Sequence, residues 1–287
     1  MTRSWPGSRR VRPGKNRRLS ESGVRSPESG VRSPESRLDV ALNERIMLYI
    51  DRSLSNPELD LAFDQALLEA CEANRAPEGY LRVWEPGSHF VVMGRTGRIE
   101  REVYIAACER LQIPVFRRLS GGGTVLLGPG CLNYTLILRH DRSPGLEDVQ
   151  VTNQTIMSRI RSALAPLDSR TPEVRGCTDL TVDGLKFAGN AQARKRHAIL
   201  FHGTILLEID LKLMEEVLRH PPREPGYREG RGHSEFLTTL KTNPARIKEA
   251  LKNEWAAGNK GHTPDIEEVR SVARNTFGRV GWSYARS

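Results

Sequence analysis

The sequence predicts an α+β fold in which a mixed β-sheet is flanked by helices. Short apolar runs typical of strands recur from residue 47 to residue 209, and segments with helical three- and four-residue spacing separate them. The chain has 287 residues and a mean hydropathy of -0.50, which suits a globular domain with one sizeable core. We therefore expect a single domain over residues 47–287.

The first helix is expected over residues 57–74, after a strand at residues 47–51. Asn56 offers a side-chain oxygen to the free amides of the first turn, and the ring of Pro57 suits the first helical position. Apolar residues recur after it at three- and four-residue spacing, so one helix face should pack on the core.

The later elements follow from the same two periodicities and from turn residues between them. Strands are expected at residues 80–85, 89–94, 113–119, 124–128, 132–138, 179–184, 185–192 and 198–209, with a hairpin turn at Asp183 and Gly184. Helices are expected at residues 99–111, 147–165, 210–219 and 244–256. The strands are expected to form one sheet of many strands.

Residues 1–46 have a different composition. They hold 11 of the 44 Lys and Arg and 5 of the 35 Asp and Glu, so the rest of the chain is close to balanced, at 33 against 30. The heptad ESGVRSP occurs twice, and its Ser, Pro and charge content predicts a disordered basic tail. Met47 just before the first apolar segment also fits a start codon assigned too far upstream. A balanced domain without a dense basic face argues against a nucleic-acid partner.

Hydropathy and cysteine usage predict a cytoplasmic protein. The sequence lacks the run of about 18 to 20 apolar residues that crosses a bilayer and the apolar stretch of a secretory signal. The four cysteines, at positions 71, 108, 131 and 177, are sparse and show no C-x-x-C pair, which favours reduced thiols. We expect no membrane partner.

Candidate chemistry begins at a glycine-rich segment. Arg117 and Arg118 end a predicted strand and lead into Ser120, Gly121, Gly122, Gly123 and Thr124. Consecutive glycines allow positive φ and let backbone N–H groups approach an anion, and a guanidinium contacts oxyanions through two parallel donors. The segment is not a P-loop, because Gly-Lys-Ser/Thr is missing. A tight hairpin would explain the glycines alone as well as a ligand does.

Two further segments carry polar residues within strands. Lys186 lies on an otherwise apolar strand, where a fixed ammonium could neutralise charge on a carboxylate or acyl phosphate. An arbitrary lysine is more often a solvated edge residue. His202 and Gly203 lie inside a strong β run, and a glycine there usually marks the close approach of a ligand or of another backbone.

In this order the segments resemble the lipoate-protein ligase A and octanoyltransferase family, within the biotin/lipoate protein ligase catalytic superfamily. The resemblance spans about residues 47–285 and includes NPELDLAFDQALLE, RRLSGGGTV, KFAGNAQ, HGTILL and YREGRGHSEF. It implies a biotin/lipoate ligase-like catalytic domain. It also implies that lipoate or octanoate is activated with ATP as the acyl-adenylate and passed to a lysine of a 2-oxoacid dehydrogenase lipoyl domain or of the glycine-cleavage H protein.

The resemblance assigns roles to particular residues. Arg117, Arg118 and the Ser120–Thr124 segment would wrap the acyl chain and the adenylate phosphate, and Lys186 would contact the activated carboxyl. Asp179 would hold the nucleotide end and a possible magnesium ion. The remaining residues implied to line or support the pocket are Asn133, Gly189, Asn190 and His202. No tightly bound cofactor is implied, and the base that deprotonates the acceptor lysine is unassigned.

Three features depart from the ligase pattern. Leu126-Leu-Gly-Pro-Gly-Cys131 replaces the usual Tyr-His-Asp-x-Gly-Asn and is reminiscent of octanoyltransferases that use acyl carrier protein. The sequence ends near Trp282, where ligases continue into a small accessory domain, so a separate accessory chain is one expectation. Cys177, nine residues before Lys186, could form an acyl thioester, although the nucleophile of related transferases lies further upstream.

Three functions therefore stay open. The first is an ATP-dependent ligase, which the lysine and the glycine segment favour. The second is an ATP-independent octanoyl or lipoyl transferase that takes its acyl group from acyl carrier protein through Cys177. The third is a non-catalytic lipoyl-binding paralogue. A basic cluster at Arg223, Arg228, Arg231 and His233 could steer an acidic lipoyl domain or carrier protein toward the pocket, or could simply be a solvated loop.

Overall fold

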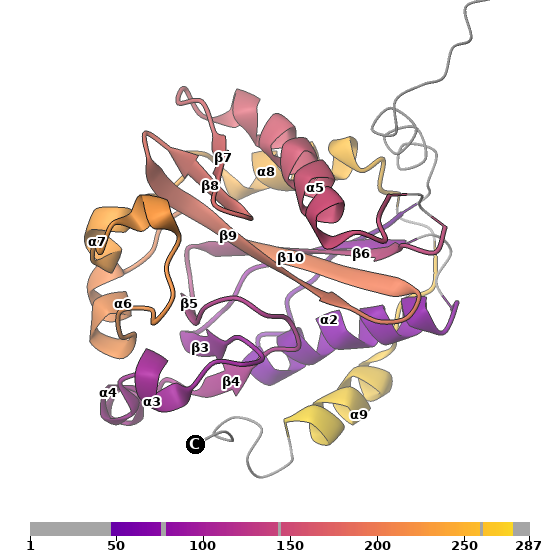
Figure 1. Cartoon of the computed structure of the whole chain (residues 1–287). Coiled ribbons are helices and arrows are strands. Elements are labelled where there is room, and N and C mark those ends of the chain that lie inside the picture. Colours follow the sequence, from indigo (N-terminus) through magenta and orange to yellow (C-terminus); the bar gives the residue numbers. More distant parts are fainter. Residues whose placement is uncertain (1–46, 76–78, 143–144, 259–260, 278–287) are drawn as a thin grey trace, which may run out of the picture. The chain divides into compact units, whose positions relative to one another are not determined.

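The computed structural model describes residues 47–75, 79–142, 145–258 and 261–277. The predicted N-terminal tail, residues 1–46, lies outside these ranges. Within them the chain forms two sheets and the helices that pack on them (Figure 1), which confirms the predicted α+β class. The prediction of a single sheet is wrong, because the described strands form a large sheet and a separate, smaller one.

The large sheet has seven strands. Its spatial order is β1 (Leu48–Asp51), β2 (Gly79–Trp84), β6 (Cys131–Arg139), β10 (Ala198–Leu206), β9 (Leu185–Arg194), β8 (Asp179–Val182) and β7 (Glu173–Arg175). Strands β1 and β2 are parallel and the other neighbours are antiparallel. The Asp183-Gly184 turn joins β8 to β9 with φ of 52° and 73°, as a two-residue hairpin of this type requires. This predicted turn is confirmed.

The small sheet carries the segment that leads into the three glycines. It has the order β4 (Val115–Arg117), β3 (Phe90–Met93) and β5 (Val125–Leu127). Strand β3 pairs with β4 in parallel and with β5 in antiparallel fashion. It therefore does not pair with the preceding strand β2 and does not extend the large sheet. The glycines therefore connect two strands of the small sheet across β3.

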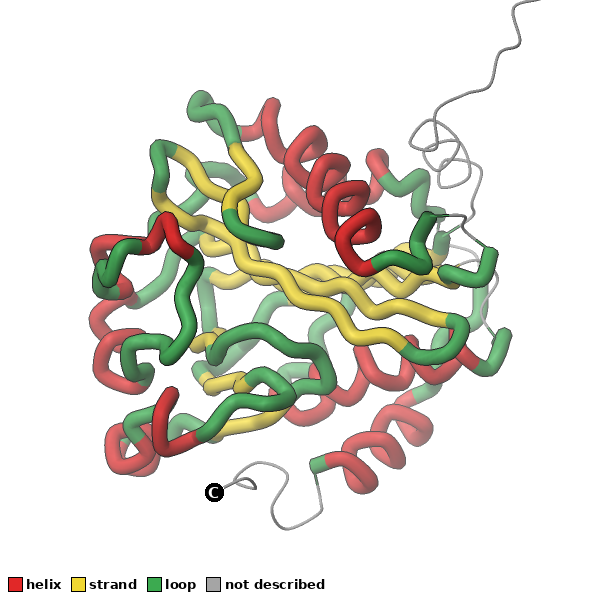
Figure 2. The backbone as a smooth tube through the Cα atoms, in the orientation of Figure 1, coloured by secondary structure: helices red, strands yellow, loops and turns green. Residues whose placement is uncertain are grey.

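Helices cover both faces of the large sheet (Figures 1 and 2). Helices α5 (Val149–Leu164) and α8 (Pro244–Glu254) pack with the buried side chains of one face. Helices α2 (Pro57–Glu72) and α9 (Ile266–Thr276) pack on the other face near one end of its strands. The small sheet forms its own apolar cluster with Trp84 of β2, so it lies on the same side as α2.

The start of α2 confirms the capping prediction. The side chain of Asn56 accepts a hydrogen bond from Leu59 N at 2.9 Å, and Pro57 occupies the first turn. Helix α9 was not expected from the sequence. Its signal was a capping box, in which Asp265 and Glu268 each accept a backbone N–H of the other.

The helix expected at residues 99–111 is two short helices, α3 (Ile99–Glu102) and α4 (Ile105–Arg110). Val103 between them is extended and pairs with Leu218, just after helix α6 (Leu211–Val217). Tyr104 N donates to Val217 O at 2.9 Å, and Arg219 N donates to Glu102 O at 3.0 Å. These long-range backbone hydrogen bonds interrupt the helix. Sequence periodicity is local and therefore did not predict the break.

One further segment bears on the site. After α6 the chain forms a 3₁₀ turn at Gly226–Arg228 and helix α7 (His233–Phe236), and residues 237 and 238 then pair with Lys186 of β9. We call residues 219–237 the flanking segment. Among the described residues, no helix combines the length and apolarity needed to span a bilayer.

Candidate active site

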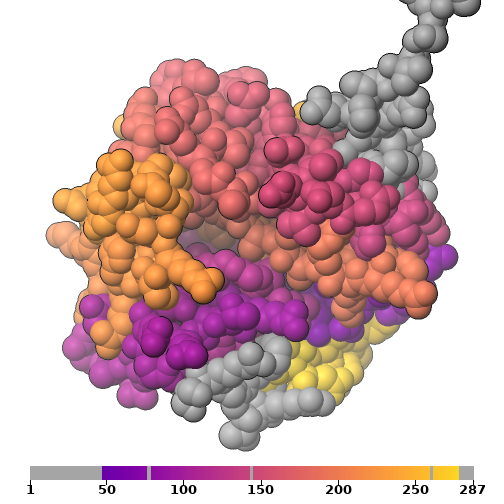
Figure 3. Space-filling view, in the orientation of Figure 1, coloured from indigo at the N-terminus to yellow at the C-terminus, as the bar shows by residue number. Residues whose placement is uncertain are grey.

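A cavity of about 440 Å³ lies between the large sheet, the small sheet and the flanking segment. In Figure 3 the surface is hollowed between the orange flanking segment and the purple residues of the small-sheet region. Eleven of the residues predicted from the sequence line it: Arg118, Gly122, Gly123, Thr124, Asn133, Cys177, Asp179, Lys186, Gly189, Asn190 and His202. The other three, Arg117, Ser120 and Gly121, do not line it.

Strand register explains why distant residues meet there. Trp84, Asn133, Thr204, Gly189 and Asp179 are successive partners across β2, β6, β10, β9 and β8. Partners in register present their side chains to the same face of a sheet. This row forms the floor of the cavity, and the small sheet lies over the same face.

Arg118 shapes the glycine segment from within. Its Nη2 donates to the carbonyls of Gly121 and Gly123, both at 2.8 Å, and its Nε donates to Ser120 Oγ at 2.9 Å. Burial lowers the pKa of Arg118 to about 10, which still leaves the guanidinium charged at neutral pH. Gly122 has a φ of 87°, so the prediction of positive φ in this segment is confirmed at this glycine.

Arg117 points the other way, as successive strand residues do. It is buried, and its Nη1 donates to Gly94 O at 3.0 Å and Gly97 O at 2.8 Å in the turn after β3. A Cβ atom on Gly94 would lie 2.0 Å from Gly122 O, so the two loops touch through their backbones. The structure therefore separates the two arginines that the sequence grouped at the ligand.

His202 is tied to the same segment. Its Nε2 lies 2.6 Å from Ser120 Oγ, which already accepts from Arg118. Arg118 only donates to Ser120 Oγ, so the serine hydroxyl hydrogen can go to Nε2 of His202. Burial, with the charge of Arg118 as the second cause, lowers the pKa of His202 to about 3. In this geometry His202 holds the loop and has no free base at Nε2.

Thr124, at the far end of the glycine segment, is held by a residue not singled out from the sequence. Its Oγ1 donates to Glu102 Oε2 at 2.6 Å, and Glu102 Oε1 accepts from Arg98 N at 2.9 Å. Glu102 is buried and lines the cavity. In the sequence Glu102 is one acidic residue in the helix predicted at residues 99–111, and nothing in that pattern places it near the glycines.

Lys186 reaches Asp179 because β9 contains an irregularity. The register shifts between Leu180 and Thr181, whose partners are Ala188 and Lys186, so Phe187 is an extra residue. A β-bulge of this kind changes which face a side chain takes. Lys186 Nζ lies 2.7 Å from Asp179 Oδ1, and a Cβ atom on Gly189 would come within 2.7 Å of that nitrogen. Gly189 thus leaves room for the ion pair.

The second oxygen of Asp179 is also engaged. Tyr227 of the flanking segment donates its hydroxyl to Asp179 Oδ2 at 2.8 Å. Burial and the neighbouring carboxylate raise the pKa of Tyr227, so its hydroxyl stays protonated. The tyrosine was quoted in the family resemblance but was not predicted as a site residue.

Gly203 is explained by two side chains. Tyr134 donates its hydroxyl to Asn190 Oδ1, and a Cβ atom on Gly203 would lie 1.8 Å from that oxygen and 2.8 Å from the hydroxyl. Asn190 Nδ2 donates in turn to Thr178 O at 2.7 Å. The missing side chain of Gly203 therefore leaves space for Asn190 and Tyr134. The sequence had predicted the close approach of a ligand or of another backbone at this position.

Two buried donors on the floor lack a partner among the described residues. Asn133 Oδ1 accepts from Thr204 Oγ1 at 2.6 Å, but Asn133 Nδ2 has no hydrogen bond. The same is true of Nε1 of Trp84, its cross-strand partner. Buried donors of this kind are normally satisfied by water or ligand.

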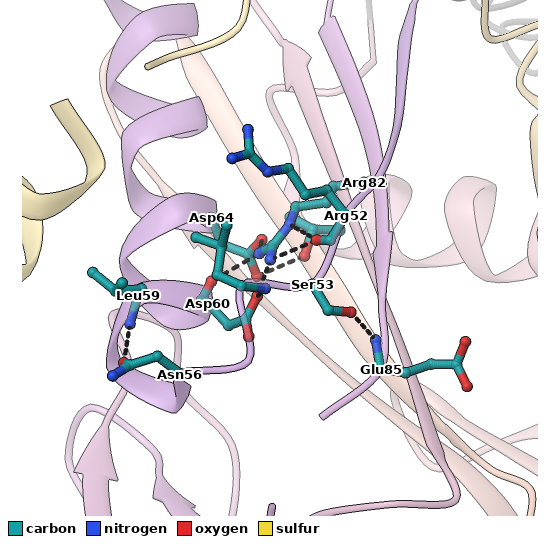
Figure 4. A network of polar contacts seen from close by, with 10 residues as sticks. Arg52, Ser53, Asn56, Leu59, Asp60, Asp64, Arg82 and Glu85 are labelled. Atoms are coloured by element: carbon teal, nitrogen blue, oxygen red, sulfur yellow. Dashed lines mark hydrogen bonds and ion pairs between the residues drawn. The ribbon is translucent and has the colours of Figure 1, made fainter. Parts of the chain in front are cut away.

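Beside this floor lies a buried charge network (Figure 4). The guanidinium of Arg82 on β2 donates to Asp60 and Asp64 of α2 and to the carbonyls of Asp60 and Arg52. Asp64 also accepts from Thr135 Oγ1 at 2.8 Å. Asp64 and Thr135 line the cavity, so this network supports its floor.

The cysteines divide into two groups. Cys71, Cys108 and Cys131 are buried, and burial raises the pKa of both Cys71 and Cys131 to about 11. Cys71 and Cys108 are thus small core residues. Cys177 is exposed at the turn between β7 and β8 and lines the cavity. The Gly128-Pro129-Gly130 stretch is a turn whose Gly130 O accepts from Leu207 N and Glu208 N, and it does not line the cavity.

The predicted basic cluster is split between cavity and backbone. Arg223, Arg228 and His233 line the cavity, while Arg231 Nη2 donates to Tyr227 O at 2.6 Å. Arg228 is buried over the ring of Phe236. Its Nη2 has no hydrogen-bond partner among the described residues, so it can still receive an acceptor from a bound molecule.

The residues around Asp179 do not by themselves fit a magnesium ion. Lys186 and Tyr227 take its two oxygens, and the described ranges hold no group of three or more His, Cys, Asp or Glu side chains arranged for a metal. Magnesium is usually held by one or two carboxylates together with substrate phosphates. Asp179 as a magnesium ligand therefore stays a prediction, and we derive no step from it.

Comparison with known proteins now identifies the family. The sequence profile described as the lipoyl protein ligase A/B catalytic domain matches residues 56–253. The chain belongs to this family. Among curated members, lipoate-protein ligase LplJ of Bacillus subtilis is 26% identical over 256 residues, which cover 84% of this chain and 74% of the ligase.

Octanoyltransferase LipM of Geobacillus kaustophilus is equally similar, at 26% identity over 279 residues that cover 85% of this chain and 99% of the transferase. Solved structures share the fold. A bipartite lipoate protein ligase of Thermoplasma acidophilum superposes with a TM-score of 0.67 at 21% identity, covering 85% of this chain and 98% of that chain. An ATP-bound lipoate-protein ligase A gives 0.60 at 22% identity, with 83% and 97% covered. The predicted ligase-like fold is confirmed, and the family includes ligases and acyltransferases.

Proposed function

We propose that the chain lipoylates proteins as an ATP-dependent ligase. The main support is the Lys186–Asp179 ion pair, which lies at the wall of a cavity that Arg118 and the glycine segment also line. A cation fixed by a carboxylate stabilises negative charge that develops on carboxyl and phosphate oxygens. The curated ligase relative, and a structural relative that binds ATP, support this activity.

The reaction has two steps. A carboxylate oxygen of lipoate or octanoate attacks the α-phosphorus of ATP, the bond to the β-phosphate oxygen breaks, and pyrophosphate leaves. The neutral ε-amine of the acceptor lysine then attacks the acyl carbonyl, AMP leaves with the anhydride electrons, and the nitrogen loses a proton. Both steps build charge on oxygens that Lys186 Nζ would contact, while Leu61, Val92 and Leu127 offer an apolar wall for the acyl chain.

The proposed acceptor is a lipoyl domain or the H protein. A structural relative is described together with its E2 lipoyl domain, which supports the first of these. The same relative is a bipartite ligase, which also supports the expectation of a separate accessory chain. Arg223 and His233 at the cavity would lie on the side from which an acidic acceptor approaches.

One observation favours a second candidate. Cys177 is exposed and lines the same cavity as Lys186, and the similar octanoyltransferases support a carrier-dependent reaction. Here the Cys177 thiolate would attack the thioester carbonyl of octanoyl carrier protein and release the carrier thiol. The acceptor amine would then attack the new thioester, lose a proton and regenerate the thiolate.

The test is intact-mass spectrometry of an apo lipoyl domain incubated with the full chain. One reaction contains lipoate, ATP and magnesium, and a parallel reaction contains octanoyl carrier protein alone. We expect an acyl mass shift and pyrophosphate only in the first, with Cys177→Ser close to wild type and Lys186→Ala inactive. Acylation only from the carrier, lost in Cys177→Ser, would replace the ligase proposal with the second candidate. Ligand binding without transfer in either reaction would point to a required accessory chain or to the non-catalytic lipoyl-binding paralogue.

A further inference from the structure

Asp179 joins two segments that are far apart in the sequence. Its Oδ1 holds Lys186 Nζ at 2.7 Å, and its Oδ2 accepts the hydroxyl of Tyr227 at 2.8 Å. Asp179 and Lys186 belong to one hairpin, whereas Tyr227 lies on the flanking segment. One carboxylate therefore receives a donor on each oxygen, which leaves it little freedom to rotate.

Tyr227 is itself fixed at several points. Its ring packs on Phe236 with centroids 5.2 Å apart, and its carbonyl accepts from Arg231 Nη2 at 2.6 Å. A Cβ atom on Gly176 would come within 3.7 Å of the tyrosine ring, so the ring rests on the turn before β8. The hydroxyl is thus presented to Asp179 by packing on both sides.

We propose that Tyr227 is a positioning residue that acts through Asp179 to hold the Lys186 ammonium at the reacting carboxyl. The inference rests on the proposed acyl transfer. Without the phenol, Asp179 keeps one fixed oxygen and can turn about its side-chain bonds, and Lys186, which is 25% exposed, can follow it into the cavity. Charge stabilisation depends on placement to within about half an ångström, so a loosened pair is a poorer catalyst.

The same arrangement couples the flanking segment to the lysine. Leu237, the last residue of the segment, forms a β-bridge with Lys186, and Thr238 N directly after it donates to Lys186 O at 2.9 Å. The segment therefore contacts the backbone of Lys186 and, through Tyr227 and Asp179, its side chain. Arg228 and His233 of this segment line the cavity. A molecule that displaces the segment would therefore also displace the ion pair.

The test compares Tyr227→Phe with Tyr80→Phe. Both changes remove only a hydroxyl, and the hydroxyl of Tyr80 donates to His262 O at 3.1 Å, away from the cavity. For Tyr227→Phe we expect kcat to fall about tenfold with KM for the acyl substrate within about twofold, while Tyr80→Phe keeps both. In an Asp179→Asn background, Tyr227→Phe should lower kcat by less than about a further twofold, because the carboxylate that Tyr227 positions is already absent.

A merely structural role would give another pattern. Tyr227→Phe would then lower the melting temperature, raise KM together with lowering kcat, and add its full effect to that of Asp179→Asn. Either additivity or an unchanged kcat overturns the proposal.

A second measurement does not require activity. The full chain is treated with trace acetic anhydride, and acetylation of Lys186 is compared by mass spectrometry with that of exposed Lys212. We expect Tyr227→Phe to raise the ratio about threefold or more and Tyr80→Phe to leave it unchanged, because a loosened ion pair frees the amine more often. An unchanged ratio contradicts the positioning role even if the proposed ligase activity fails.

Discussion

The Arg82 network and the Lys186 pair both join a basic side chain to aspartate, but in different surroundings. Arg82 is fully buried, and its five N–H groups make five hydrogen bonds to four acceptor atoms, two of which are carboxylate oxygens. Its guanidinium also lies 4.6 Å from the ring centre of Phe63 and 5.0 Å from that of Trp84. Every donor is used, so this cation can only hold the fold together.

The Lys186 pair is open by contrast. The Lys186 side chain is 25% exposed, and its nitrogen pairs with the carboxylate of Asp179. An ammonium has three donors, so a bound oxyanion can be added without breaking the existing contact. The difference indicates how one domain separates stability from chemistry: charges saturated by protein stabilise it, and charges left unsaturated at a cavity act on ligands.

The strongest way to break this comparison is to remove Arg82. We expect Arg82→Met to lower the free energy of unfolding by about 3–5 kcal/mol, because two buried carboxylates lose their counterion. Denaturant unfolding followed by circular dichroism measures this. The control is Arg75→Met, since the exposed Arg75–Glu268 pair should contribute no more than about 1 kcal/mol. Equal effects in the two variants would contradict the distinction.

Removal of Lys186 should do the reverse. We expect Lys186→Ala to reduce acyl transfer by at least about 100-fold, because the developing charge loses its stabilising cation. The free energy of unfolding should change by less than about 1 kcal/mol, since a partly exposed pair is screened by water. Intact-mass assays and denaturant melts on the same preparation give both numbers. A large loss of stability would show that Lys186 is structural.

Sequence reasoning singled out both residues of the open pair, although not their contact, and missed the closed network. Asp183 and Gly184 predicted the hairpin that brings Asp179 and Lys186 close, because an Asp-Gly turn fixes pairing over a few residues. The bulge at Phe187 that aims the lysine could not be predicted, since it depends on packing of both faces. Nothing in the sequence singles out Arg82, because its partners Asp60 and Asp64 lie about one turn apart on α2 and meet it only in the folded chain.

Long-range contacts set the other limits. Tyr227 lies 48 positions from Asp179, and local periodicity carries no information about that distance. Similarly, adjacent Arg117 and Arg118 were grouped at the ligand, although strand alternation sends them to opposite sides. The fold class needed only local patterns, whereas the site needed the register of five strands.

A smaller change sharpens the comparison at Gly189. An added methyl group would lie 2.7 Å from Lys186 Nζ and 2.8 Å from its Cε, so Gly189→Ala should push the flexible end of the lysine off Asp179 without disturbing the backbone. We expect a loss of about tenfold in kcat, with the melting temperature nearly unchanged. Gly87→Ala, where a Cβ would meet no atom within 4 Å, is the matched control. Full activity of Gly189→Ala would mean that the pair tolerates displacement.

The smallest expected effect concerns His202, whose neutral ring joins the glycine segment to β10. Its pKa is lowered to about 3 by burial, so between pH 3 and 6.5 the unfolded chain binds more protons than the folded one. The contribution of His202 to stability is therefore present above pH 6.5 and is lost as the pH falls. At pH 5.5 the loss should be about 1 kcal/mol, and His202→Gln should lack this component whereas His262→Gln, an exposed histidine, should keep it. Denaturant melts at pH 7.5 and 5.5 measure the difference, and an identical pH dependence in wild type and His202→Gln would mean that the ring is protonated in the folded protein and that Ser120 accepts from it.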